Sequence, residues 1–260
     1  MPEVLRIEDR GAVRVLQLHR PEARNALSTE LVVALYAALL EADVDESVNV
    51  IVLTGSDPAF CAGVDLKEAA RDGAAYFDTV VAHNCVALVG ELSTPVIGAV
   101  NGAAFTGGLE LALGCDFLLA SDRAVFADTH VRAGVLPGGG LTARLPRAVG
   151  PQHARRMSMT GEVLGASDAL RLGLVTEVVP HLELLPRALA VAAAVAEVPP
   201  AFLLPLKQMY VASDGPGLTH ALEQEGRIAL ASPIDHARLE DRRTALMTRN
   251  RQQLASQGDT

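Results

Sequence analysis

Two continuous apolar runs mark the chain most clearly. Residues 49–53 (NVIVL) and 96–100 (VIGAV) are short runs that are apolar apart from Asn49, which is typical of strands buried on both faces. Each run is followed by a segment of small residues, 59–68 (AFCAGVDLKE) and 101–110 (NGAAFTGGLE). The order of strand, glycine-containing loop and helix therefore occurs twice, which predicts a layered α/β core with functional loops after the strands.

The remaining pattern extends this core on both sides. Residues 4–7 and 12–18 read as strands joined at Gly11 in a hairpin. Ser28 precedes an apolar period that reaches about Glu41, so we expect it to cap a helix. Further predicted elements are helices at residues 74–92 and 109–113 and strands at residues 115–120 and 124–127.

After Val178 the pattern becomes mostly helical. Pro199, Pro200 and Pro233 separate the periods, which predict helices at residues 181–196, 201–212, 217–231 and 234–250. The polar end, residues 252–260, is expected to fray. We therefore expect a β/α core over residues 1–195 and a helical region over residues 196–260.

Composition limits the classes of function. Half of the 260 residues are hydrophobic and only 3% are aromatic, so Ala, Val and Leu must fill the core. The net charge of −9 and the absence of a basic stripe exclude nucleic acid and anionic membranes as expected partners. Three cysteines without a CxxC pair and a charged amino-terminal segment lead us to expect a cytoplasmic protein without disulfides.

The two small-residue segments have the layout of an oxyanion site. Gly107 and Gly108 lie between a predicted strand and a predicted helix, where first-turn N–H groups lack partners and attract negative charge. Glu110 would lie in the same turn, and the N–H of Val64 in the other segment is a candidate second donor. Close helix–strand packing and an ordinary surface turn are the alternative interpretations of these segments.

Several longer segments together resemble the crotonase (enoyl-CoA hydratase/isomerase) superfamily, in that family's order. They are HRPEARNALS (19–28), AFCAGVDLKE (59–68), TPVIGAVNGAAFTGGLELALGCDF (94–117), AGVLPGGGLTARLPRAVG (133–150) and DALRLGLVTEV (168–178). The resemblance covers at least residues 10–180, and the helical carboxyl-terminal part fits more loosely. It implies a spiral of ββα units with a helical trimerisation region, and a homotrimer or a dimer of trimers.

The resemblance also implies a ligand, an acyl-CoA thioester. Its carbonyl would accept hydrogen bonds from the N–H groups of Val64 and Gly107, which strengthen as an enolate forms. The coenzyme A path would follow two backbone segments, and Arg24 and Lys67 are candidate phosphate partners. The residues implied for this path are Arg24, Ala26, Ala62, Asp65, Leu66 and Lys67. We expect no cofactor, because coenzyme A enters as part of the substrate.

The catalytic positions contain one departure from the family pattern. Hydratases of this family use two glutamates, and Glu110 matches the first. The second position carries His130, in the segment FADTHVRAGVLPGGG. An imidazole with an ordinary pKa near 6.5 is able to donate or orient a proton. Asp128, two residues earlier, would share a strand face with His130 and reach the same site.

These residues favour hydration of a 2-enoyl-CoA thioester, with Glu110 and His130 as the catalytic pair. An enoyl-CoA isomerase is one alternative, because a single base suffices to move a proton between C2 and C4. A non-catalytic acyl-CoA-binding protein is another, since the second carboxylate is replaced by His130.

Other motifs are set aside. Residues 138–143 (GGGLTA) fit a dinucleotide fingerprint, but Pro137 precedes them and Pro146 follows closely, where that motif needs a strand and a long helix. The seven histidines show no metal-ligand spacing with cysteine, so we expect no metal. Cys61 has no activating partner in the sequence and is expected to be a small buried apolar residue.

Overall fold

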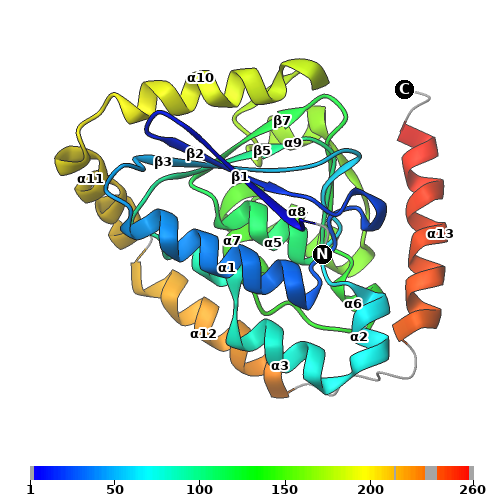
Figure 1. The fold of residues 1–260 in the computed structure, drawn as a ribbon. Coiled ribbons are helices and arrows are strands. Elements are labelled where there is room, and N and C mark those ends of the chain that lie inside the picture. Colours follow the sequence, from blue (N-terminus) through cyan, green and yellow to red (C-terminus); the bar gives the residue numbers. More distant parts are fainter. Residues whose placement is uncertain (1–2, 214, 232–238, 258–260) are drawn as a thin grey trace.

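The computed structural model describes residues 3–213, 215–231 and 239–257, and its strands form two sheets (Figure 1). The larger sheet has six strands in the order β1-β2-β3-β5-β7-β10. Only β1 runs antiparallel to its neighbour in this sheet, and every other pairing is parallel. The bounds are β1 Leu5–Arg10, β2 Val13–Leu18, β3 Val50–Gly55, β5 Val96–Val100, β7 Phe117–Ser121 and β10 Glu177–Val179.

The smaller sheet has four very short strands in the order β4-β6-β8-β9. They are β4 Ala59–Cys61, β6 Ala103–Phe105, β8 Val125–Ala127 and β9 Leu164–Gly165. β4, β6 and β8 pair in parallel, and β9 is antiparallel to β8. The chain thus runs three times through a strand of the larger sheet and then a strand of the smaller one before it enters a helix. The three pairs are β3–β4, β5–β6 and β7–β8. This arrangement confirms the expected α/β fold of successive ββα units.

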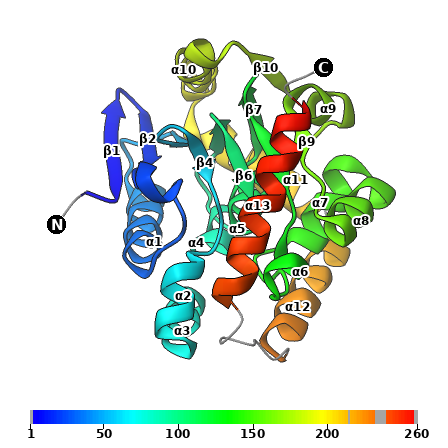
Figure 2. The same cartoon turned by 90° about the vertical axis from the view of Figure 1, so that its right-hand side faces the viewer.

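Helices cover the sheets and make up the carboxyl-terminal part of the chain (Figures 1 and 2). Two 3₁₀ turns, η1 Pro21–Ala23 and η2 His181–Glu183, accompany them. The α-helices are α1 Thr29–Val44, α2 Leu66–Asp72, α3 Ala74–Ala82, α4 Cys85–Val89, α5 Gly107–Gly114, α6 His130–Ala133, α7 Leu141–Val149, α8 Pro151–Thr160, α9 Ala166–Leu172, α10 Leu184–Ala196, α11 Pro200–Ser213, α12 Gly215–Ala231 and α13 Leu239–Gln257.

The large sheet is buried on both faces. Along β3, Val50 and Val52 pack toward α10, whereas Ile51 and Leu53 belong to the main core, which also contains the apolar side of α1. This alternation follows from the period of two in a strand. Figure 1 shows α10 along one face of the sheet and α1 along the other. A strand buried on both faces has no polar positions, which is why residues 49–53 read as a continuous apolar run.

Most predicted elements are confirmed, and one helix is corrected. The hairpin turns at Gly11, whose φ is +64°, and the Ser28 hydroxyl accepts from the N–H of Leu31 at 3.2 Å to cap α1. Residues 74–92 do not form one helix. The chain breaks after Ala82, and Asn84 caps the separate helix α4 by accepting from the N–H of Ala87.

The strands β4 and β6 of the smaller sheet were not predicted, because three residues are too few for a periodic pattern to show. The expected fraying at residues 252–260 was wrong for the part that is described, since α13 continues to Gln257. The first part of the helix expected at residues 234–250 falls outside the described residues until Leu239.

The carboxyl-terminal helices pack onto the rest of the same chain. α12 lies against α7, and α13 lies against α2 and α6 (Figure 2). The division near residue 195 stays a prediction. Within the described ranges no single helix is long and apolar enough to cross a membrane. The helices His181–Ala196 and Pro200–Val211 reach that length and apolar composition only when taken together, and the chain bends sharply between them.

Candidate active site

Glu110 is a buried carboxylate held by backbone N–H groups. It lies in the first turn of α5 and is 5% exposed. Its Oε1 atom accepts from the N–H of Gly139 at 2.8 Å and from that of Leu141 at 3.3 Å. A carboxylate bound in this way keeps a fixed orientation, and its second oxygen, Oε2, is left for other contacts.

His130 faces that second oxygen. Its Nε2 atom lies 3.4 Å from Oε2 of Glu110, and its Nδ1 atom lies 2.7 Å from Oδ1 of Asp128. The same Asp128 oxygen accepts from the backbone N–H of His130 at 3.1 Å. His130 and Asp128 are 3% and 1% exposed, so the three side chains form a buried row in which the imidazole lies between two carboxylates.

Asp128 reaches the same site as His130, as expected, but the two residues do not share a strand face. β8 ends at Ala127, and His130 is the first residue of α6. The two side chains meet because the carboxylate of Asp128 turns back to the N–H at the start of that helix.

The row of side chains sets the charge on the imidazole. Burial by itself lowers the pKa of His130, but the charge of Glu110 and the hydrogen bond to Asp128 outweigh it and raise the pKa to about 10. Burial would raise the pKa of Asp128, yet the contact with His130 holds it below its ordinary value. At neutral pH the site thus contains an imidazolium beside Asp128 and Glu110.

The N–H groups of Val64 and Gly107 lie close together. Leu27 forms a parallel bridge with Val64, in which its N–H binds the carbonyl of Gly63 and its own carbonyl accepts from Asp65. The N–H of Val64 therefore points away from Leu27. A Cβ placed on Gly107 would lie 3.8 Å from the nitrogen of Val64, which puts the two segments in contact. Gly107 opens α5, so its N–H has no acceptor within the helix.

The residue before Gly107 is held in a strained conformation. Thr106 has a φ of +56°, which costs free energy for any residue with a Cβ. Its hydroxyl lies 2.6 Å from that of Thr129, and its N–H donates to the carbonyl of Ala127. Because Thr129 precedes His130, these bonds fix the Gly107 segment relative to the imidazole.

Two glycines permit the close approaches that the site needs. A Cβ on Gly139 would lie 2.9 Å from Oε2 of Glu110, and one on Gly63 would lie 2.7 Å from the carbonyl oxygen of Phe105. Gly63 also has a φ of +87°. Any side chain at either position would displace the Glu110 carboxylate or the Val64 segment. The loop at residues 138–140 thus cradles a protein carboxylate, and it follows no strand, as a dinucleotide site would require.

The residues predicted for the coenzyme A path lie on two adjoining segments. The N–H of Ala62 donates to the carbonyl of Arg24, while Ala26 lies next to the bridge between Leu27 and Val64. The remaining predicted residues of this path are Asp65, Leu66 and Lys67 at the start of α2. The side chains of Arg24 and Lys67 are exposed.

The side chain of Asp65 has structural partners. It accepts from the N–H groups of Lys67 and Glu68 at the start of α2, and it pairs with Arg20 at 2.9 Å. Arg20 also donates to the carbonyl of Ala26, so one cation joins the two segments. Any contact of Asp65 with coenzyme A would therefore have to come from its backbone.

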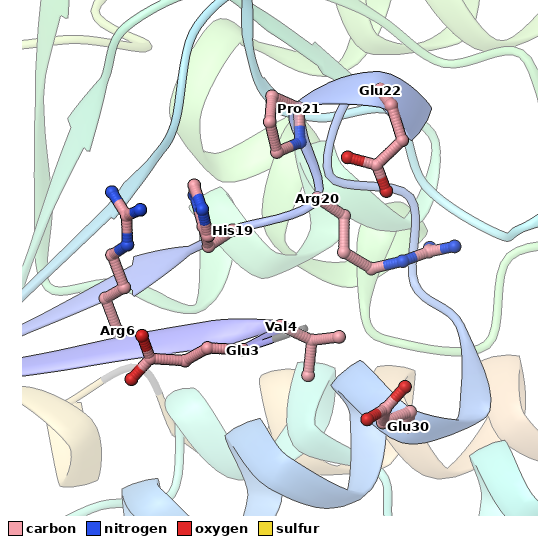
Figure 3. Close-up of a pocket in the computed structure, with 8 residues that line it drawn as sticks. All are labelled: Glu3, Val4, Arg6, His19, Arg20, Pro21, Glu22 and Glu30. Atoms are coloured by element: carbon pink, nitrogen blue, oxygen red, sulfur yellow. The ribbon is translucent and has the colours of Figure 1, made fainter. Parts of the chain in front are cut away.

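An open pocket of about 470 Å³ lies beside this region (Figure 3). It is lined by the edge of β1, the turn η1 and the start of α1. Its residues are Glu3, Val4, Arg6, His19, Arg20, Pro21, Glu22 and Glu30. Glu110 and His130 do not line it, so the buried row is separate from this pocket.

Two further buried residues position these segments, and the sequence analysis missed both. The Asn25 side chain donates to the carbonyls of Ser56 and Ala59 at 2.7 Å each. The Tyr76 hydroxyl donates to the carbonyl of Leu27 at 2.5 Å and accepts from the N–H of Asp65. Their partners lie more than ten residues away in sequence, so no local pattern could have revealed them.

Cysteine and metal chemistry find little support at the site. Burial raises the pKa of Cys61 to about 12, which keeps its thiol protonated and unreactive. Within the part of the chain that the structure describes, no group of three or more His, Cys, Asp or Glu side chains converges as a metal site would.

Comparison with known proteins agrees with this geometry. Residues 8–252 match the family described as enoyl-CoA hydratase/isomerase. A protein of Arabidopsis thaliana named probable enoyl-CoA hydratase 1, peroxisomal, is 39% identical over 223 residues, which are 84% of this chain and 82% of that protein. A protein named crotonyl-CoA hydratase from Syntrophomonas wolfei is 38% identical over 189 residues, 69% of this chain and 70% of that one.

Solved structures show the same fold. The crystal structure of enoyl-CoA hydratase from Mycobacterium tuberculosis H37Rv is 47% identical, with a TM-score of 0.79 over 87% of this chain and 97% of that one. An enoyl-CoA hydratase/isomerase from Pseudoalteromonas atlantica T6c is 28% identical, with a TM-score of 0.81 over 95% and 98% of the two chains. The ββα fold, the family match and the identity to these relatives agree: the chain belongs to the enoyl-CoA hydratase/isomerase family.

Proposed function

We propose that this enzyme adds water to the C2–C3 double bond of a 2-enoyl-CoA thioester. The observation that carries the proposal is the buried row of Glu110, His130 and Asp128 beside the N–H groups of Val64 and Gly107. A base, an acid and two oxyanion donors are the groups that syn hydration requires. Glu110 and His130 are the catalytic residues in this assignment.

The first step follows from the orientation of Glu110. Its Oε1 atom is bound by the loop, so Oε2 takes a proton from water while the water oxygen attacks C3. Electrons from the double bond move to the thioester oxygen, which the N–H groups of Val64 and Gly107 stabilise as an enolate. No cofactor is needed, because coenzyme A is part of the substrate.

The second step uses His130 as the acid. Its imidazolium gives the Nε2 proton to C2 as the enolate collapses, which completes the addition of H and OH. The proton held by Glu110 then returns to Nε2 across the 3.4 Å contact and restores both groups. The hydrogen bond from Nδ1 to Asp128 keeps the ring oriented throughout.

The remaining parts of the proposal concern coenzyme A and assembly. We assign the nucleotide and pantetheine path to the segments carrying Arg24, Ala26, Ala62, Asp65, Leu66 and Lys67. Phe202, Leu206 and Met209 are exposed on one side of α11 at helical spacing, which supports a homotrimer or dimer of trimers through this region. Fatty-acid or related acyl-CoA metabolism in the cytoplasm is the setting that we propose.

A turnover screen tests the proposal. Purified enzyme is given saturated, 2-enoyl and 3-enoyl thioesters, and the products are identified by mass spectrometry. We expect the 3-hydroxyacyl thioester from crotonyl-CoA. Conversion of a 3-enoyl thioester without hydration would replace the proposal with isomerisation. Tight binding of all three thioesters without turnover would show a binding protein instead.

A further inference from the structure

Each of the helices α11, α12 and α13 is joined to the rest of the chain by a charged side chain. Lys207 of α11 is 8% exposed and donates to the carbonyl of Thr94 at 3.0 Å and to Asp116 at 2.8 Å. Arg249 of α13 donates to the carbonyls of Thr160 and Gly161. Glu225 of α12 is 7% exposed and reaches the loop that binds the catalytic carboxylate.

Two glutamates divide the N–H groups of that loop between them. Glu110 accepts from Gly139 and Leu141, and Glu225 accepts from the alternate residues. The Glu225 Oε1 atom lies 2.5 Å from the nitrogen of Gly140, and its Oε2 atom lies 2.5 Å from the nitrogen of Thr142. The Thr142 hydroxyl also donates to Oε2. The loop is therefore held by two carboxylates that are 115 residues apart in sequence (225 − 110).

The two sets of bonds depend on each other. Glu110 and Glu225 bind alternate N–H groups of one four-residue stretch, residues 139–142, in which Gly140 has a φ of +108°. A third contact supports the loop, because the partly buried side chain of Arg144 donates to the carbonyl of Gly139 at 3.2 Å. If the Glu225 bonds are lost, Gly140 and Thr142 no longer fix the peptides that hold Glu110.

We infer that Glu225 is a positioning residue for catalysis: through the loop at residues 139–142, it fixes the orientation of the Glu110 carboxylate. Helix α12 then acts on catalysis through Glu225 and the loop that this side chain binds. The role of Glu225 in hydration rests on the proposed function, but its mechanical link to Glu110 does not.

Replacement of Glu225 by Gln tests the link in turnover. The amide keeps one acceptor oxygen and places an NH₂ group against an N–H donor, so half of the loop contacts fail. We expect kcat for crotonyl-CoA to fall between about tenfold and a hundredfold, because a misplaced catalytic group slows the chemical step. KM should stay near the wild-type value, because the contacts of Glu225 are with the loop that orients Glu110 and not with the segments assigned to coenzyme A.

The matched control is Lys207→Met, which removes the equally buried polar anchor of α11. It should cost stability and leave kcat near the wild-type value, because its partners Thr94 and Asp116 lie outside the Glu110 loop. An E225Q enzyme with wild-type kcat would overturn the inference. So would an equal fall of kcat in both variants, which would indicate general loosening of the carboxyl-terminal helices.

A second readout is independent of turnover. In protein labelled with ¹⁵N-histidine, the His130 imidazole signal, assigned with His130→Gln, reports the contact between Nε2 and Glu110. E225Q should move this signal and K207M should not. If E225Q fails to fold, Thr142→Val removes one hydroxyl bond to Glu225 and should move the signal less. An unmoved signal in the folded variant refutes the link, whereas an inactive wild type with a moved signal refutes only the proposed function.

Discussion

Two histidines of this chain have similar partners and different surroundings. His130 lies between Asp128 and Glu110, and His181 lies between Asp57 and Ser121. The second cluster has the residue types of a Ser–His–Asp triad, with Nδ1 at 2.9 Å from the Ser121 hydroxyl and Nε2 at 3.0 Å from Asp57. Partner chemistry alone would make His181 a catalytic candidate as strong as His130.

Location separates the two clusters. Ser121 is fully buried at the end of β7, and its hydroxyl is also bonded to the N–H of Arg123, so no substrate carbonyl can reach it. The Asp57 side chain is 63% exposed, which weakens its influence on the ring by solvent screening. His130, in contrast, is enclosed with two carboxylates next to the N–H groups of Val64 and Gly107. Burial between two carboxylates therefore distinguishes the histidine that we propose as the acid from one that joins structural elements.

The largest effect should come from replacing each histidine by Gln. His130→Gln removes the proposed acid, so the rate of crotonyl-CoA hydration should fall by about a hundredfold or more. His181→Gln should leave the rate near the wild-type value. Steady-state assays of the two purified variants measure this difference. Equal losses in both would mean that His130 has no special role in the reaction.

The next largest difference is expected in the pH dependence of kcat when the aspartate partner of each histidine is replaced by Asn. Asp128 raises the pKa of His130 by its hydrogen bond and charge, so Asp128→Asn should move the alkaline limb of the rate profile about one pH unit or more toward neutrality. Asp57→Asn should leave this limb in place. The profile of kcat against pH from 6 upward decides between them. An unmoved limb in the Asp128 variant would show that His130 is not the titrating acid.

A smaller effect should appear in stability against pH. The pKa of His130 is about 10 in the folded chain and near 6.5 when unfolded, so its contribution is complete below pH 6.5. Between the two values only the folded chain keeps the proton, and the free energy of unfolding decreases by at most about 1.4 kcal/mol per pH unit. The contribution is lost above pH 10.

Urea titrations from pH 6 to 10 measure this dependence as a difference between proteins. The wild type and His181→Gln should lose the His130 contribution, whereas His130→Gln should lack it. A His130→Gln curve parallel to that of the wild type would contradict the raised pKa.

Local patterns allowed part of this site to be predicted. The strands at residues 49–53 and 96–100 are recognisable in the sequence as apolar runs, and the glycine-containing segments that follow them are recognisable as well. Glu110 and His130 were paired through the family resemblance, and the structure places them in contact.

The remaining parts depend on contacts between distant residues. β4 and β6 become strands through pairing with each other and, for β6, with β8, and three residues are too few to show a period. Asn25, Tyr76 and Glu225 each bond to backbone far along the chain, so their neighbours in sequence say nothing about their roles. Nothing in their residue types separates them from ordinary surface or core positions until the chain is folded.

The most direct measurement is the rate of crotonyl-CoA hydration by the wild type and by Glu110→Gln at one pH, with the affinity for a saturated acyl-CoA measured in parallel. Removal of the base should lower kcat by a factor of about 10²–10⁴ while the affinity is retained. A Glu110→Gln enzyme that hydrates crotonyl-CoA at the wild-type rate would contradict the assignment of Glu110 as the base that activates water.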